Sequence, residues 1–379
     1  MQFKFTDEHL LIQQAARDFA QNELAPGVIE RDELQKFPTE QIKKLGELGF
    51  LGMMVSPEYN GAGFDTISYV LAIEEISKID ASTSVIMSVN NSLICYGLEK
   101  FGTAEQKEKY LKPLAAGEII GAFCLSEPEA GSDANAQQTN VTDYGDYYLL
   151  NGLKNWITSG STASVYIVIA KEDATKGLKG MNALILEKGT EGFTIGRKEN
   201  KMGVRGSDTH SLMFTDVKIP TANLLGKQGS GFEIAMKVLE AGRIGIAAQA
   251  LGIASGAYEL ALAYSKQRKA FSKPIADHQA IRFKLAEMAT DIEAARLLCL
   301  KAAWLKDKGL HFANASSKAK LFASNVAMKT TIEAVQIHGG YGYVKEYHVE
   351  RLMRDAKITQ IYEGTSEIQR LIISRELLK

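Results

Sequence analysis

A nearly continuous helix is predicted by residues 232–268, FEIAMKVLEAGRIGIAAQALGIASGAYELALAYSKQR, and a second one by residues 278–306, HQAIRFKLAEMATDIEAARLLCLKAAWLK. In the second stretch, apolar side chains recur every three to four residues and form one stripe: Ile281, Leu285, Met288, Ile292 and Ala295. Because long helices joined by short links are typical of bundles, residues 231–379 are expected to form a C-terminal four-helix bundle.

The two preceding regions have different patterns. Residues 121–230 contain strand-length runs, and Asn151-Gly152 is a hairpin signal, so this region is expected to be a middle antiparallel β-domain, either a sandwich or a partly closed barrel. Residues 1–120 read as helices, the first capped by Thr6 and ended or closely followed by Pro26. The predicted fold is therefore α+β, with three domains in the order helical, β, helical.

Composition excludes several classes of protein. The 379 residues carry a net charge of -1 without a basic stripe, which argues against nucleic-acid binding. Apolar runs are too short or too interrupted by charge for stable membrane insertion. The start, MQFKFTDEHL, lacks the features of a secretory or transit signal, so a bacterial cytoplasm is expected, although a mature mitochondrial matrix protein would look the same. Three scattered cysteines and six histidines without metal-binding spacing predict no metal site.

Three segments in the middle of the chain each allow a structural and a functional interpretation. An apolar run stops at Ser126 before a Pro/Gly-rich loop, which is either an ordinary strand end or a ligand loop. Trp156 and Thr158 share one strand face by alternation, as core residues or as flanks of a ring system. Glu240 and Arg243, three residues apart on a long apolar helix, form either an ion pair or a polar spot for a ligand.

The most informative segment near the C-terminus is TQIYEGTSEIQR, residues 359–370. Ser366 and Gln369 fit a capping box, which places Glu363 and Gly364 just before a helix start. A carboxylate there can simply complement the helix dipole. It can also act as a general base in an apolar pocket, beside backbone N–H groups that stabilise an oxyanion. Upstream, QIHGGYGYV lacks a Rossmann glycine pattern and predicts a helix that ends at Gly339-Gly340.

Six segments together resemble the acyl-CoA dehydrogenase family, closest to its short-chain (butyryl-CoA) bacterial type. They are CLSEPEAGSDA, NGLKNWITSG, KMGVRGSDTHSLMFTDVKIP, the RKAF of SKQRKAFSKPIADHQAI, EAVQIHGGYGYV and RDAKITQIYEGTSEIQR. The resemblance covers essentially the whole chain. It implies a noncovalent FAD, a homotetramer built as a dimer of dimers, and a step of fatty acid β-oxidation.

The resemblance also implies roles for individual residues. Glu363 would be the catalytic base. The acyl-CoA substrate would meet Ser132, Glu240, Arg243 and Gly364. FAD would be bound by Phe123, Leu125, Ser126, Trp156, Ile157, Thr158, Arg268, Phe271, Gln279, Gln336, Gly339, Gly340, Thr365 and Glu367.

The chain departs from the family pattern at two positions, and a third position distinguishes between two known locations of the base. Glu240 stands where Asp is usual, and Ala270 stands where a hydroxyl residue is frequent, so one substrate contact and one FAD contact are in question. Some relatives carry the base immediately before the position of Arg243. Here that residue is Gly242, which favours Glu363.

The implied reaction is α,β-desaturation of an acyl-CoA thioester to trans-2-enoyl-CoA, with electrons passed on to electron-transfer flavoprotein. Glu363 would take the α-proton while a hydride leaves the β-carbon for the flavin. The alternatives on the same fold are a medium- or branched-chain dehydrogenase and an acyl-CoA oxidase. A flavin-free helical interaction protein is the alternative of another class.

Overall fold

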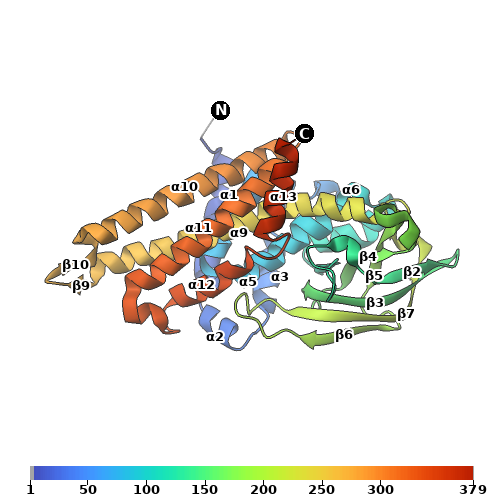
Figure 1. The fold of residues 1–379 in the computed structure, drawn as a ribbon, viewed down its shortest axis with the longest axis horizontal. Helices are drawn as coiled ribbons and strands as arrows, with labels where there is room; N and C mark the ends of the chain where they lie inside the picture. The colour runs from blue at the N-terminus through green and yellow to red at the C-terminus, as the bar shows by residue number, and fades with distance from the viewer. Residues whose placement is uncertain (1–3, 379) are drawn as a thin grey trace.

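The computed structural model describes residues 4–378, and it places helices at both ends of the chain around a β-domain (Figure 1). The sheet lies at one end of the elongated molecule, and the long C-terminal helices extend away from it toward the other end. This arrangement confirms the predicted helical, β, helical order.

The N-terminal region is a set of short helices. Thr6 caps the first of them as predicted, since its hydroxyl accepts from the His9 N–H at 3.2 Å. Three segments are π-helical: η1 (Ala20–Leu24), η3 (Val89–Cys95) and η4 (Lys107–Leu111). The α-helices are α1 (Asp7–Phe19), α2 (Val28–Glu33), α3 (Thr39–Glu47), α4 (Thr66–Ile79), α5 (Ala81–Ser88), α6 (Tyr96–Phe101), α7 (Ala104–Gln106) and α8 (Lys112–Ala115).

The middle region forms one eight-stranded sheet, in the order β6-β7-β3-β2-β4-β5-β8 with β1 also paired to β4. Its pairing is mostly antiparallel, but β1 and β2 both run parallel to β4, which the antiparallel prediction did not include. The strands are β1 (Gly121–Cys124), β2 (Asn140–Asp143), β3 (Tyr147–Thr158), β4 (Val165–Lys171), β5 (Met181–Glu187), β6 (Phe193–Lys198), β7 (Thr209–Pro220) and β8 (Leu224–Leu225).

The hairpin predicted at Asn151-Gly152 is wrong, because β3 runs through both residues without a turn. The Asn151 side chain instead exchanges two hydrogen bonds with Asp216 on the neighbouring strand, at 2.8 and 3.0 Å. The pairing with β7 shifts register between Leu150 and Gly152. Gly152 is needed there for close approach, since a Cβ would lie 2.7 Å from Cα of Thr139. The dipeptide marks a β-bulge between paired strands.

The C-terminal region confirms the two long helices, as α9 (Gly231–Gln267) and α10 (Gln279–Asp307), and adds α11 (Ala313–His338). The predicted stripe of α10 faces inward, with four members buried and Ile281 packed at its edge. Helix α11 ends at His338, and its C-cap residue Gly339 has a φ of 61°. Two shorter helices follow, α12 (His348–Ile358) and α13 (Ser366–Leu377), and a small hairpin, β9 (Lys269–Ala270) with β10 (Lys273–Pro274), connects α9 to α10.

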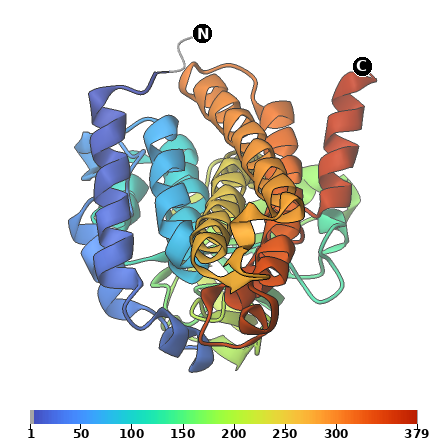
Figure 2. The same cartoon turned by 90° about the vertical axis from the view of Figure 1, so that its left-hand side faces the viewer.

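Helix α9 lies in the centre of the molecule, packed against α4, α10 and α11. By length and composition it could cross a membrane, but 72% of its most apolar window is buried inside the protein, as in the core helix of a globular protein. The first and last helical regions share one hydrophobic core, which runs from Ile12 to Ala356. Viewed nearly end on, the blue N-terminal helices lie on one side and the orange and red C-terminal helices on the other (Figure 2).

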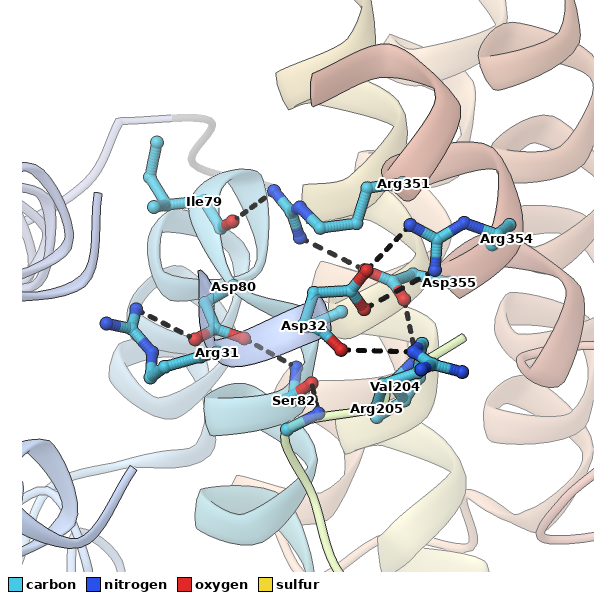
Figure 3. A network of polar contacts seen from close by, with 12 residues as sticks. Arg31, Asp32, Ile79, Asp80, Ser82, Val204, Arg205, Arg351, Arg354 and Asp355 are labelled. Carbon is cyan, nitrogen blue, oxygen red and sulfur yellow. Dashed lines mark hydrogen bonds and ion pairs between the residues drawn. The ribbon is translucent and has the colours of Figure 1, made fainter. Parts of the chain in front are cut away.

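A network of charges joins the three regions at one point (Figure 3). Arg354 on α12 pairs with Asp32 of the N-terminal region at 2.7 Å. Asp355, also on α12, accepts from the Val204 N–H of the β-domain at 2.5 Å and pairs with Arg351 at 3.1 Å. Arg205 of the β-domain adds a direct contact to the N-terminal region, because its side chain donates to the Asp32 carbonyl at 3.0 Å. The network fixes α12, and therefore the segment that leads to Glu363, against both other regions.

Candidate active site

A cavity of about 420 Å³ opens where the β-domain, the η3 segment, α9 and the α12–α13 link meet. Its walls are mostly apolar, with a few polar groups at definite places. Ten of the residues predicted to bind ligand or to catalyse line it: Phe123, Leu125, Ser126, Ser132, Trp156, Ile157, Thr158, Arg243, Glu363 and Gly364. These residues come from four separate parts of the sequence, and the fold brings them to one surface.

A second cavity, of about 560 Å³, lies between the end of α9 and the end of α11. Arg268, Gly339 and Gly340 line it, together with Tyr264 and Tyr341, and the Arg268 guanidinium lies 5.5 Å from the Tyr341 ring centre. It is open and partly aromatic.

Six predicted residues line neither cavity. Phe271 is 90% exposed on the β9–β10 hairpin, where its ring meets His278 edge on. Gln279, Gln336 and Glu367 are also exposed. Thr365 caps α13. Glu240 pairs with Lys237 at 3.2 Å, so the alternative of an ion pair with Arg243 is not what the structure shows.

Glu363 sits in strained backbone at the wall of the first cavity. Its φ is 53°, in the left-handed region that few side chains adopt, and Gly364 follows at 92°. The Oε2 atom is buried and has no hydrogen-bond partner among residues 4–378. Burial raises the pKa of this carboxyl to about 7, while the nearby charges of Lys320 and Arg243 oppose the rise. A group with a pKa near neutrality can accept a proton and release it again.

Gly242 makes room for this carboxylate. A Cβ at position 242 would lie 2.2 Å from Oε2 of Glu363 and 2.7 Å from Cδ2 of Leu93. No side chain can therefore occupy position 242 while Glu363 keeps its place. The resemblance favoured Glu363 as the base because Gly242 has no side chain to serve, and in the structure the absence of a side chain at 242 also leaves room for the Glu363 carboxylate.

The helix start after Glu363 differs from the prediction by one residue. Thr365, not Ser366, is the N-cap, and its hydroxyl accepts from the Ile368 N–H at 3.3 Å. The Gln369 side chain does not close a capping box. Its Nε2 donates instead to the carbonyls of Gly364 and Glu363, at 2.8 and 3.2 Å, because the backbone turns sharply and brings both carbonyls over the first turn of α13.

Sequence reasoning missed Lys320. This residue lies on the buried face of α11, is 0% exposed, and donates from Nζ to the Gly364 carbonyl at 2.7 Å. The available signal was its spacing, since Ser316, Lys320, Ala323 and Ala327 follow a helical period and all four are buried. A lysine on an otherwise small and apolar stripe is a candidate for a buried charge.

The opposite wall of the cavity is held by a second buried lysine. Lys154, also 0% exposed, donates to the Leu125 carbonyl at 2.9 Å, to Glu127 at 2.7 Å and to Gln137 at 2.8 Å. The Asn155 N–H donates to the Ser126 carbonyl at 2.8 Å. These contacts tie the end of β1 and the loop after it to β3.

The strand alternation used to align Trp156 and Thr158 is interrupted. The β3–β7 register shifts between Lys154 and Ile157, and Trp156 adopts a positive φ of 63°. Trp156, Ile157 and Thr158 all line the cavity as a result. The indole is 58% exposed, which is unusual for a tryptophan without a ligand or a partner to cover it.

The fold and the cavity together define a class of three-part proteins in which a β-domain and two helical regions enclose a site with one buried, elevated-pKa carboxylate. Three family models divide the chain in the same order: the N-terminal domain of acyl-CoA dehydrogenase matches residues 6–118, the middle domain 122–217, and the C-terminal domain 229–378. The chain belongs to the acyl-CoA dehydrogenase family.

Individual relatives are similar over their full length. "Acyl-CoA dehydrogenase, short-chain specific" of Clostridium acetobutylicum is 51% identical, with 100% of both chains covered. The structure of butyryl-CoA dehydrogenase from Megasphaera elsdenii matches with a TM-score of 0.99 at 50% identity, again over 100% of both chains. A chain from work on the electron transferring flavoprotein of Acidaminococcus fermentans gives 0.99 at 51%, also over 100% of both chains.

Proposed function

We propose that this chain is an FAD-dependent acyl-CoA dehydrogenase that converts short-chain acyl-CoA thioesters to trans-2-enoyl-CoA, with Glu363 as the base. The observation that carries the proposal is the Glu363 carboxylate, which faces an interdomain cavity from a strained backbone, with a pKa raised to about 7 and space reserved for it by Gly242.

The residues around the cavity fit a flavin. A flat, half-exposed indole at Trp156 borders it, together with the small polar side chains of Ser126 and Thr158 at the ends of two tied strands. When bound, FAD supplies the acceptor for the hydride that leaves the substrate β-carbon. Leu125, Ser126, Trp156 and Thr158 would hold its ring system. Arg268, Gly339 and Gly340 in the second cavity would hold the rest, with Phe271, Gln279 and Gln336 exposed nearby for a neighbouring subunit.

Glu363 removes the α-proton of the thioester. Its pKa of about 7 lets it accept and release a proton near neutral pH, and general-base catalysis of this kind typically contributes ~10²–10⁴-fold. The α-proton is a weak acid, so the carbonyl must be polarised, and we propose that the backbone N–H groups of the Glu363–Gly364 segment do this. One oxyanion donor of this kind is typically worth ~3–4 kcal/mol. Val89, Leu93 and Leu239 provide apolar walls that keep water from the carboxylate.

The substrate and partners follow from the same cavity and from the relatives. The bacterial relative is short-chain specific by name, and the matched structure from Megasphaera elsdenii is a butyryl-CoA dehydrogenase, which supports a short acyl chain. Ser132 and Arg243 line the cavity and are proposed to meet the CoA portion, whereas the contact from Glu240 remains a prediction. We expect electrons to pass to electron-transfer flavoprotein, a protein named in the work on the Acidaminococcus fermentans chain.

Assembly and location are also inferred. Large apolar side chains on α10 and α11 are exposed in the single chain, which supports a homotetramer built as a dimer of dimers: Phe283, Leu297, Trp304, Phe322 and Ile332. Both bacterial and mitochondrial proteins are among the similar relatives, and we infer a bacterial cytoplasmic location from the bacterial one that is 51% identical.

The decisive experiment is anaerobic mixing of the purified yellow protein with butyryl-CoA. Wild type should lose its flavin colour, and Glu363→Gln should stay yellow and bind the thioester but barely bleach. Glu191→Gln, which changes an exposed glutamate of the β-domain, is the matched control and should bleach like wild type. Normal bleaching of Glu363→Gln would sink the assignment of the base. A colourless wild-type protein would exclude the flavoenzyme, and rapid peroxide formation in air would favour an oxidase.

A further inference from the structure

Lys320 is a buried charge beside the proposed base. Its side chain comes from the middle of α11, is 0% exposed, and reaches the α12–α13 link, where Nζ donates to the Gly364 carbonyl at 2.7 Å. No carboxylate lies within 4 Å of it among residues 4–378. The carbonyl of a neutral peptide is thus its hydrogen-bonded partner.

The carbonyl that Lys320 binds belongs to Gly364, which directly follows the strained residue Glu363. Glu363 and Gly364 both have positive φ, and the Gly364 carbonyl receives a second hydrogen bond from Gln369 at 2.8 Å. The carbonyl is therefore held by two donors, one charged and one neutral. Both donor residues are fully buried.

Holding a carbonyl does not by itself require a charge. Removing an ammonium group from water costs several kcal/mol, and Gln369 shows that a neutral amide can make the same contact. A charge at position 320 therefore needs a reason beyond the hydrogen bond. The acidic group that interacts most strongly with it is Glu363, whose carboxylate has no hydrogen-bond partner on Oε2 in the described part of the chain.

We propose that Lys320 is a positioning residue that fixes the Gly364 carbonyl, in the residue directly after Glu363, and stabilises the ionised form of the Glu363 carboxylate. The catalytic meaning of this inference rests on the proposed function. The electrostatic part does not, because it concerns two groups within the folded chain.

The surrounding charges are consistent with this role. Arg243 faces Glu363 from α9, and Glu367 interacts weakly with Lys320 from α13. The phenols of Tyr69 on α4 and Tyr362 in the α12–α13 link also interact electrostatically with Glu363. Burial raises the pKa of both phenols above their usual range, so they stay neutral. Burial lowers the pKa of Lys320 to about 7, although the negative charge of Glu363 acts in the opposite direction. The positive charge of Lys320 in turn lowers the pKa of Glu363. The two groups therefore compete for protons in the same pH range.

The test separates the hydrogen bond from the charge. Lys320→Met removes both, and Lys320→Gln keeps a neutral donor but removes the charge. Gln369→Met removes the other hydrogen bond to the same carbonyl and leaves all charges in place. In each holoprotein, the protonation of Glu363 is followed by infrared difference spectroscopy against pH, using the carboxylic acid band that is absent in Glu363→Gln.

In wild type the midpoint is expected near pH 7. Both Lys320 variants should move it upward by about 1 pH unit or more, since an opposite charge nearby typically shifts a carboxyl by ~1–3. Gln369→Met should leave it unchanged, and the pH profile of flavin reduction should follow the same pattern. An unmoved midpoint in the Lys320 variants, or an equal shift in Gln369→Met, would overturn the proposal. If the midpoint moves but wild type does not oxidise acyl-CoA, the proposed function fails and the role of Lys320 stands.

Discussion

Adding a single methyl group to the central helix should displace the carboxylate of Glu363, the proposed base, without unfolding the protein. In Gly242→Ala, the new Cβ would lie 2.2 Å from Oε2 of Glu363, whereas ordinary contact begins near 3.4 Å. The carboxylate must therefore move by about 1.2 Å. The helix itself should accept the substitution, since alanine is better than glycine in a helix interior by ~1 kcal/mol.

A displacement of ~1 Å at a reacting group can lower the rate by ~10²-fold. We therefore expect flavin reduction by butyryl-CoA in Gly242→Ala to be slower by roughly that factor. Leu93 must also give way, because its Cδ2 would lie 2.7 Å from the new methyl, and such overpacking typically costs ~1–3 kcal/mol. The two effects on stability partly offset each other, so the free energy of unfolding should fall by ~0–2 kcal/mol and the variant should remain folded.

The assay is stopped-flow bleaching under anaerobic conditions, with thermal unfolding of the same samples. Gly97→Ala is the matched control. It is also a buried helical glycine, but its new Cβ would meet Val238 Cγ1 at 3.2 Å, a few tenths of an ångström inside ordinary contact, and would not approach Glu363, so bleaching should proceed at the wild-type rate. The steric argument is wrong if Gly242→Ala reduces its flavin as fast as wild type.

Three further predictions concern the base and the two cavity walls. The pKa of Glu363 is raised from 4.5 to about 7 in the folded state, so the stability that this group contributes is complete below pH 4.5 and is lost as pH rises through 7. The free energy of unfolding in urea should therefore increase for Glu363→Gln relative to wild type across this pH window, on the order of 3 kcal/mol at most. A difference between the two proteins that does not change with pH would contradict this prediction. Lys154→Met leaves the Glu127 carboxylate buried without its ion-pair partner, so the free energy of unfolding should fall by ~3–5 kcal/mol. Adding Glu127→Gln should restore part of that stability, and a double variant no more stable than the single one would argue against the ion pair. Leu93→Ala enlarges the apolar wall beside the base, and bleaching rates along a ladder of acyl-CoA lengths should shift toward longer chains at a cost of ~2–5 kcal/mol in stability; an unchanged optimum would show that Leu93 does not limit chain length.

The features predicted well from sequence were those with a repeating physical cause. The apolar stripe of α10 has a helical period because one face of the helix must be buried, and the structure buries it. The end of α11 was predicted equally well from its glycines, because few other residues adopt the backbone angles found at Gly339.

Features that depend on a distant partner were predicted less well. Asn151-Gly152 matches a hairpin turn locally, but Asn151 pairs with Asp216, which lies 65 residues later in the sequence, and this pairing keeps the segment extended. Lys320 could not be connected with Glu363 for the same reason, since nothing within α11 shows that the Gly364 carbonyl will lie 2.7 Å from its side chain. Glu363 was predicted as the base because its segment carries the unusual glycine and the helix start together, and this role stays a prediction.

The network that joins Asp32, Val204 and Asp355 also bears on how a newly made chain acquires its active site. Asp32 pairs with Arg354, which lies 322 residues later in the sequence, so the N-terminal helices lack this ion pair until the last part of the chain has been synthesised. Contacts over such distances form late, because the intervening chain must first be ordered. Residues of all three regions line the cavity, so we expect the complete cofactor site only in a chain whose three regions have assembled. Damage to this network should therefore be seen mainly as a low yield of yellow protein rather than as slow turnover.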